Sequence, residues 1–147
     1  MTPIQRLAPT AARYLLGAVF FVFGLNGFLQ FLPQPPMPVA AGSFFGALAA
    51  TGYLLPLVKI VEVTAGVMLL SNRFVPLALA LLAPNVVNIV LFHAMLAPGG
   101  LGIALVVLAL EVGLAVSYRE AYKPMLRARN EAKAPRTSPL APATAAS

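Results

Sequence analysis

Two long stretches of the chain carry no formal charge, and they constrain the fold more than any other feature of the sequence. No Asp, Glu, Lys or Arg occurs in the 45 residues between Arg13 and Lys59, or in the 37 residues between Arg73 and Glu111. An α-helix needs about 20 largely apolar residues to cross the hydrocarbon core of a bilayer. Only 10% of the 147 residues are charged, against about 25% in an average soluble domain. The sequence therefore predicts an integral membrane protein.

Prolines, glycines and polar residues divide the apolar sequence into four predicted crossings. We predict an all-α transmembrane bundle over residues 11–122, with helices at about 11–32, 55–71, 76–97 and 101–118. Turn segments at 33–38, 71–73 and 98–100 separate them, because proline and glycine end helices. Residues 39–50 are uncharged but too few to span, so we expect a short non-spanning helix between the first two crossings.

The basic residues predict how the bundle is oriented. Lys and Arg near the crossings are retained in the cytoplasm. Arg6 and Arg13 precede the first crossing, Arg73 lies between the second and third, and eight charged residues lie within 119–136. Four crossings with both termini inside satisfy this pattern, which makes 1–10 a cytoplasmic N-terminus. The segment 123–147, basic and then rich in Pro and Ala, is a predicted disordered cytoplasmic tail.

Two other interpretations of these segments are less well supported. A cleaved signal peptide would place its cleavage site near Val39-Ala40-Ala41. However, the apolar segment 14–32 exceeds the usual h-region of about 7–15 residues, and four prolines separate it from that site. The basic pI could also indicate nucleic-acid binding, but retention of positive charge in the cytoplasm already explains it. We therefore expect the lipid bilayer, and no nucleic acid, as the partner of these segments.

The composition excludes several kinds of chemistry. The sequence has no Cys and no Asp, and its single His is His93. Disulfides, thiolate chemistry, Cys-ligated zinc and iron–sulfur clusters are therefore excluded. A self-contained metal site, a Ser-His-Asp triad and a bis-His haem are not expected either. We predict no metal site and no covalently bound cofactor.

Polar side chains within the predicted crossings are the candidate functional residues. An ionisable side chain at the centre of a transmembrane helix costs about 2.5–3.5 kcal/mol on insertion scales, so such residues usually have a role. Most of them fall in the outer half of the predicted bundle, which predicts a shared polar pocket that opens outward. The set comprises Asn26, Lys59, Glu62, Asn85, Asn88, His93 and Glu111.

Each candidate has a structural alternative. Lys59 and Glu62 are three residues apart on one helix face, so they form either a structural ion pair or part of a site. Glu111 lies about 15 Å deep and cannot reach water, so we expect it to be protonated or hydrogen-bonded, with Asn85 as a suitable donor. His93 is either a packed interfacial residue or a functional group. Asn26 lies between two glycines, which favours close helix packing.

Several motifs together resemble the DoxX family of small bacterial membrane proteins. The resemblance covers roughly residues 10–120, and its motifs are Phe23-Gly24-Leu25-Asn26-Gly27-Phe28, Thr51-Gly52-Tyr53-Leu54, Lys59-Ile60-Val61-Glu62, Arg73-Phe74-Val75-Pro76-Leu77-Ala78 and Asn88-Ile89-Val90-Leu91-Phe92-His93. It implies a four-helix bundle in the bacterial cytoplasmic membrane. It also implies a connection with quinone-linked oxidation of sulfur compounds or with membrane redox homeostasis, together with partner proteins. The positions that match the family pattern are Asn26, Lys59, Glu62, Asn88 and His93, and no catalytic role is carried over to them.

Two main functional hypotheses follow, and enzymatic activity is left open. In the first, the protein is a membrane subunit of a quinone-linked redox system, in which His93 and Lys59 donate hydrogen bonds to the quinone while Glu62 or Glu111 handles protons. In the second, it is a non-enzymatic scaffold or assembly factor whose polar residues fix helix register. A small-solute or proton path is a third alternative, and it would need an oligomer. The spacings Gly42/Gly46 and Ala109/Gly113 permit such self-association.

Overall fold

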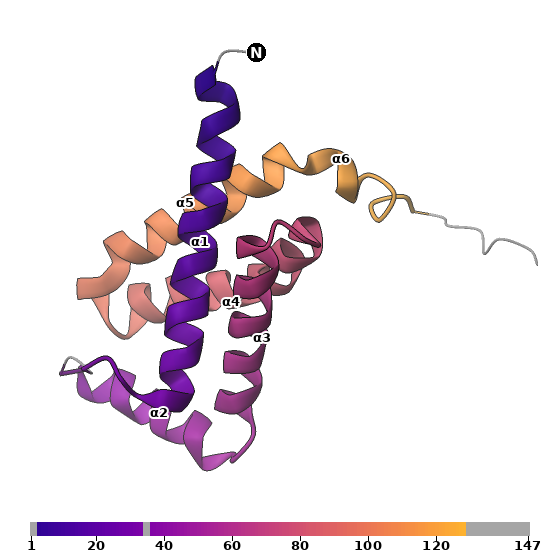
Figure 1. Ribbon diagram of the computed structural model, residues 1–147. Helices are drawn as coiled ribbons and strands as arrows, with labels where there is room; N and C mark the ends of the chain where they lie inside the picture. The colour runs from indigo at the N-terminus through magenta and orange to yellow at the C-terminus, as the bar shows by residue number, and fades with distance from the viewer. Residues whose placement is uncertain (1–2, 34–35, 129–147) are drawn as a thin grey trace, which may run out of the picture.

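The computed structural model describes residues 3–33 and 36–128, and the elements within them are all helical. These residues form six α-helices and a short 3₁₀ turn, which confirms the predicted all-α fold for this part of the chain. Figure 1 shows how the helices are arranged. The elements are α1 (Pro3–Leu29), α2 (Val39–Ala50), α3 (Leu54–Leu70), α4 (Val75–Met95), η1 (Pro98–Gly100), α5 (Leu101–Ser117) and α6 (Arg119–Tyr122). The predicted disorder of the tail falls mostly on residues 129–147, which lie outside the described residues.

Three segments are long and apolar enough to cross a membrane. They are Leu7–Leu29 of α1, Val75–Met95 of α4, and Pro98–Ser117, which joins η1 to α5. The 17-residue α3 falls just short by itself. Together α2 and α3 also qualify, as one span broken by a bend of 94° between the two helices. The described residues thus provide three spans, or four with this bent pair, consistent with a multi-pass membrane protein.

Helix α1 differs from its predicted bounds at both ends. It begins at Pro3, about two turns before the expected start at residue 11. Pro9 lies inside it, and the helix continues through this residue although proline lacks the N–H for the bond to the preceding turn. The helix ends at Leu29, and Gln30 then takes a left-handed conformation with φ of 49°, which terminates the helix before residue 32.

Glycines allow α1 and α3 to lie unusually close. A Cβ atom added to Gly66 of α3 would lie 2.7 Å from the backbone nitrogen of Phe21 in α1. On α1, a Cβ at Gly24 would lie 2.8 Å from the Val63 side chain, and one at Gly17 would lie 3.0 Å from Leu69. Small residues at such positions let transmembrane backbones approach each other, and dispersion contacts then hold them together. The close helix packing expected around Asn26, which lies between Gly24 and Gly27, agrees with these contacts.

The buried core lies between α1, α3, α4 and α5, and its largest fully buried side chains are Leu16, Leu69, Leu79, Leu82 and Leu114. In Figure 1, α5 crosses α1 obliquely, and α2 lies across the end of the molecule opposite the N-terminus and α6. Large apolar side chains remain exposed on the outside, as on Ile60, Leu91 and Ile103, which suits contact with lipid.

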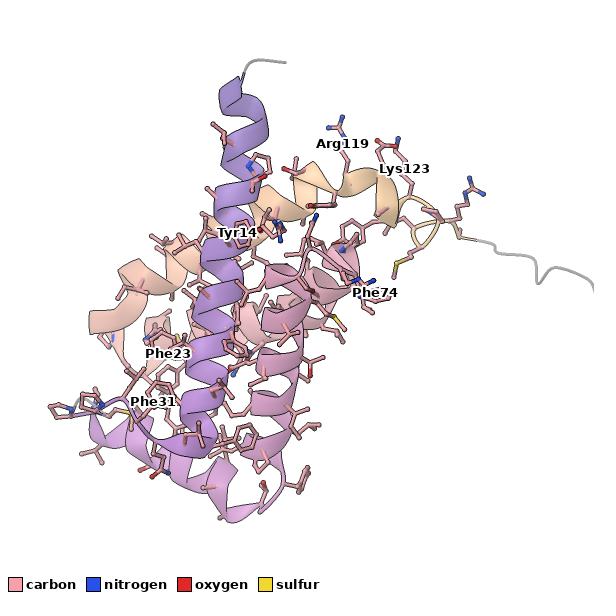
Figure 2. All side chains as sticks on the ribbon, viewed as in Figure 1. Tyr14, Phe23, Phe31, Phe74, Arg119 and Lys123 are labelled. Carbon is pink, nitrogen blue, oxygen red and sulfur yellow. The ribbon has the colours of Figure 1, made fainter. Side chains whose placement is uncertain are left out.

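The two ends of the molecule differ in charge. Figure 2 shows Arg119 and Lys123 at the α6 end, where Tyr14 also lies, whereas Phe23 and Phe31 lie toward α2. Arg13 belongs to the same end as Tyr14, since the two are neighbours on α1. In the described residues, Lys59 near the start of α3 is the basic side chain that lies toward α2. This separation agrees with the charge asymmetry on which the predicted orientation rests.

Candidate functional site

A buried polar network joins α3 to α4. The Lys59 ammonium donates to Glu62 Oε2 at 2.7 Å, and the Asn85 side-chain amide donates to Glu62 Oε1 at 2.9 Å. Glu62 is only 5% exposed, while the Lys59 side chain is 25% exposed. Both carboxylate oxygens therefore have a donor, which is the condition under which a buried charge is tolerated. Three of the candidate residues thus meet through direct hydrogen bonds.

The Asn85 contact corrects one expectation. Depth alone suggested that Asn85 would donate to Glu111 of the fourth predicted crossing, whereas its amide is directed to Glu62 of α3. The physical reason is rotation about the helix axis. Asn85 lies on the side of α4 that faces α3, and Val86 and Leu82 take the positions that are buried in the core.

An open groove lies beside this network, between the C-terminal end of α1 and the N-terminal end of α3 and against α2. Its volume is about 610 Å³. Two candidate residues line it, Asn26 and Lys59, and the aromatic rings of Phe23, Phe28 and Phe45 form much of its apolar wall. The remaining lining residues are Gly27, Gln30, Leu32, Pro33, Leu55 and Pro56. We call this feature the outer groove.

Asn26 shapes the outer groove through its side chain. Its Oδ1 atom accepts a hydrogen bond of 2.7 Å from the Leu32 backbone N–H, which fixes the chain just after α1 ends. Asn26 is 6% exposed, and its amide nitrogen makes no hydrogen bond within the part of the chain that the structure describes. The Lys59 stem runs past Gly27, where an added Cβ would lie 2.5 Å from it. The free amide N–H groups and the ammonium therefore lie on neighbouring parts of the groove.

His93 does not line the outer groove. Its Nδ1 donates to the Ala97 carbonyl at 3.2 Å, and its imidazole ring lies against Gly100, where an added Cβ would be 2.5 Å from the ring. The ring also makes an edge contact with Phe92, with 5.2 Å between centroids. His93 thus holds the turn between α4 and η1, in agreement with its structural alternative.

Phe92 connects α4 to α2. Its ring centroid lies 5.1 Å from that of Phe45 and 5.7 Å from that of Phe44. Because Phe45 also lines the outer groove, this aromatic cluster fixes one wall of the groove against α4. Asn88, one turn before Phe92, is exposed and makes no side-chain hydrogen bond within the described residues, so it stands apart from the network.

Glu111 lies in a second and separate pocket between α4 and α5. This pocket has a volume of about 290 Å³, and Glu111 itself is 5% exposed. Tyr122 of α6 lines the same pocket, and its hydroxyl donates to the Pro76 carbonyl at 2.8 Å. Burial, followed by the charge of the Glu111 carboxylate, raises the pKa of the Tyr122 hydroxyl above its usual 10.0. The seven candidates therefore do not share one pocket.

Arg13 is a buried polar residue that the sequence indicated only as an orientation signal. It is 5% exposed, and its guanidinium donates to the Leu69 carbonyl near the end of α3 and lies 4.3 Å from the centre of the Tyr14 ring. A cation at the carbonyl end of a helix is favoured by the helix dipole. Its position at the predicted start of the first crossing, followed by 45 residues without a formal charge, was the available signal that this arginine is not an ordinary surface charge.

The described residues contain no group of three or more His, Asp or Glu side chains that could hold a metal ion. The arrangement instead offers hydrogen-bond donors in an aromatic groove at one place and a carboxyl group in an apolar pocket at another. Comparisons of the chain with protein-family models, with curated proteins and with solved structures found no match.

Proposed function

We propose that the outer groove binds the head group of a membrane quinone, and that the protein is a membrane subunit of a quinone-linked redox or redox-homeostasis system. The observation that carries the proposal is that two polar side chains in the groove, one on α1 and one on α3, can both donate hydrogen bonds. Lys59 presents an ammonium and Asn26 an amide nitrogen, while the Asn26 oxygen is already engaged by Leu32. Quinone carbonyl oxygens only accept hydrogen bonds, so they complement these donors.

The walls of the groove support a planar apolar ligand. Phe23, Phe28 and Phe45 offer ring faces and edges to a flat ring, and Leu55 and Pro56 extend the apolar lining. The volume of about 610 Å³ lies within the range of about 300–1,000 Å³ that is typical of small-molecule sites. The groove is open, so an isoprenoid tail can remain in lipid while the ring is held.

Electrons reach the quinone from a partner protein in this proposal, as the resemblance to the DoxX family implies. The chain itself would bind and orient the ring through Lys59 and Asn26. The Lys59–Glu62 pair supports this role, because the bond of 2.7 Å fixes the ammonium at the edge of the groove. Removing one partner of such a pair leaves the charge of the other without a counter-charge, so the pair acts as a unit.

Titration of the purified protein with ubiquinone and menaquinone analogues, followed by quenching of the native Tyr fluorescence, tests the proposal. Lys59→Met should weaken binding by about tenfold or more, because a hydrogen bond to a charged group contributes about 1.5–3 kcal/mol. Lys123→Met is the matched control, since Lys123 also pairs with a glutamate three residues away but lies outside the groove. Phe45→Ala should also weaken binding without removing a hydrogen bond. Equal affinities for wild type and both groove variants would refute the proposal.

We further propose four crossings, with both termini on the cytoplasmic side of the bacterial inner membrane. This proposal is supported by the basic side chains of Arg13, Arg119 and Lys123 at one end of the molecule and by the bent α2–α3 pair at the other. The chain has no native Cys, so single cysteines can report sidedness directly. A membrane-impermeant thiol reagent added to intact cells should label Thr51→Cys and leave Ser71→Cys unlabelled until the cells are opened. The opposite pattern would reverse the orientation.

A scaffold or assembly role is the second candidate, and the Glu62 network favours it. Both Glu62 oxygens are satisfied inside the protein, as expected for residues that fix the register of α3 against α4. Purification in mild detergent, with mass spectrometry and cofactor spectra of the proteins that co-purify, separates the two roles. A stable partner together with unchanged quinone affinity in Lys59→Met would favour the scaffold.

A further inference from the structure

The pocket between α4 and α5 is distinct from the outer groove and has a different chemistry. Aliphatic side chains from both helices form its walls, among them Leu79, Val86, Leu108 and Val112. Neither Lys nor Arg lines it within the described residues. Its volume of about 290 Å³ gives room for about ten water-sized groups, at roughly 30 Å³ each. It is therefore large enough for a compact organic molecule.

Glu111 is the polar group of this pocket whose role is not explained by the fold. It is 5% exposed, and its Oε2 atom is buried without a hydrogen-bond partner in the described part of the chain. This contrasts with Glu62, whose two oxygens both have donors. An unsatisfied buried polar atom costs about 1–3 kcal/mol, more when it is charged, so its retention needs a reason. A ligand that supplies a donor is one such reason.

The other polar groups at the pocket are acceptors as well. The Tyr122 hydroxyl uses its proton on the Pro76 carbonyl at 2.8 Å, so only its oxygen lone pairs remain. Ala80 also lines the pocket. In a regular helix the Ala80 carbonyl would accept a hydrogen bond from the N–H of residue 84, but Pro84 has no N–H. Carboxylate, phenolic and carbonyl oxygens all call for a hydrogen-bond donor. The pocket thus complements a donor with an apolar body, whereas the outer groove complements an acceptor.

The geometry points to a binding site for a hydrophobic amine, whose nitrogen takes the proton of the Glu111 carboxyl group and stays beside the resulting carboxylate. A neutral amine enters the bilayer and reaches the pocket between the helices. There the O–H bond of Glu111 breaks and an N–H bond forms, so the net charge of the complex does not change. The ammonium formed from a primary or secondary amine has at least two N–H groups, one for Glu111 and another for the Tyr122 or Ala80 oxygen.

An amine satisfies the site better than other ligand classes. A neutral hydrocarbon would fill the pocket but leave Glu111 Oε2 unpaired. An anion would meet a carboxyl group without a basic side chain in the lining. An alcohol could donate one hydrogen bond, but it cannot form the charge-assisted pair, which is roughly twice as strong as a neutral hydrogen bond. The inference is independent of quinone binding, since the two sites share no lining residue.

The test uses cyclohexylmethylamine as the probe and cyclohexylmethanol as its neutral counterpart. Binding to the full-length protein in nanodiscs is measured by titration calorimetry, with empty nanodiscs to subtract partitioning into lipid. We expect the amine to bind wild type at least about tenfold more tightly than the alcohol, and Glu111→Gln to lose at least about tenfold in amine affinity. Glu120→Gln, an exposed acid in α6, is the control and should bind as wild type does. Equal binding of amine and alcohol, or heat no greater than that of empty nanodiscs, would overturn the proposal.

A second measurement needs no variant, so it remains informative if Glu111→Gln fails to fold. Dicyclohexylcarbodiimide, an apolar reagent, forms a stable adduct with protonated carboxyl groups in apolar surroundings. Mass spectrometry of wild type should find the adduct on Glu111 and not on Glu62, which is engaged by Lys59 and Asn85. Cyclohexylmethylamine should reduce the rate of labelling severalfold, and cyclohexylmethanol should not. Labelling that the amine does not slow would count against the proposed site.

Discussion

Replacing Gly66 with alanine should destabilise the protein, because this glycine is where α3 comes closest to α1. The added Cβ would lie 2.7 Å from the Phe21 nitrogen and 2.9 Å from its Cα. Ordinary van der Waals contact begins at 3.4 Å, so the two helices must separate by roughly 0.7 Å at this point. A gap of about 0.5–1 Å loses a quarter to a half of the attraction between the atoms it separates.

The expected size of the effect follows from two opposing terms. Overpacking of a tight contact typically costs about 1–3 kcal/mol. Alanine is a better helix former than glycine by up to about 1 kcal/mol, which offsets part of that loss. We therefore expect a net loss of about 1–2 kcal/mol in the free energy of unfolding. Leucine at the same position should be worse, because its larger side chain meets the α1 backbone, which cannot move aside as a flexible side chain does.

Gly113→Ala on α5 is the matched control, since an added Cβ there meets nothing within 4 Å. It should leave stability unchanged or raise it by up to about 1 kcal/mol. Unfolding in mixed micelles with increasing SDS, followed by far-UV circular dichroism, measures both variants under the same conditions. A Gly66→Ala protein as stable as Gly113→Ala would show that the α1–α3 contact is not tight in the membrane protein, and the reasoning would fail.

Two further predictions concern single hydrogen bonds. Asn85→Leu removes the donor to Glu62 Oε1 and should lower the free energy of unfolding by about 1–3 kcal/mol. Asn88→Leu should be neutral or stabilising, because Asn88 is exposed and its side chain makes no hydrogen bond with the described residues. The same SDS titration compares them, and equal effects would contradict the network. Tyr122→Phe should lose about 0.5–1.5 kcal/mol at neutral pH, because its bond to the Pro76 carbonyl is removed. The folded-state pKa of Tyr122 is raised above 10.0, so wild type keeps this stability below pH 10 and loses it as the pH rises further. The difference in the free energy of unfolding between wild type and Tyr122→Phe should therefore shrink above about pH 10. A gap that stays constant into that range would place the hydroxyl outside the folded contact.

Prolines, glycines and short polar segments in the sequence are sufficient to predict where most of the helices begin and end. Residues 39–50 were expected as a separate short helix, and α2 covers Val39–Ala50. The ends of α3, α4 and α5 lie within two residues of their expected positions, because Ser-Asn, Pro and Gly-Gly segments interrupt the helices there. The start of α1 was placed too late, since apolar composition marks where a helix enters lipid and not where it begins.

The hydrogen-bond partners of the polar residues were harder to predict. The position of a residue along its helix gives its depth, but not the direction in which its side chain points around the helix axis. Depth placed Asn85 level with Glu111, yet the rotation of α4 directs it to Glu62. The Lys59–Glu62 pair could be predicted, since it depends only on spacing within one helix. The Arg13 contact with the Leu69 carbonyl joins residues far apart in the sequence, and only the packing of α1 on α3 brings them together.

The shortness of α3 has a consequence for the membrane around the protein. Its 17 residues rise about 25 Å, against a hydrocarbon thickness of about 30 Å in a typical bilayer. In the proposed four-crossing arrangement, the lipid beside α3 must thin, at roughly a fraction of a kcal/mol for each ångström of mismatch. The α2 helix, turned by 94° at the N-terminal end of α3, lies where that thinning would occur. The protein should therefore favour thin bilayers, and lipids of shorter acyl chains should gather along this one side of it.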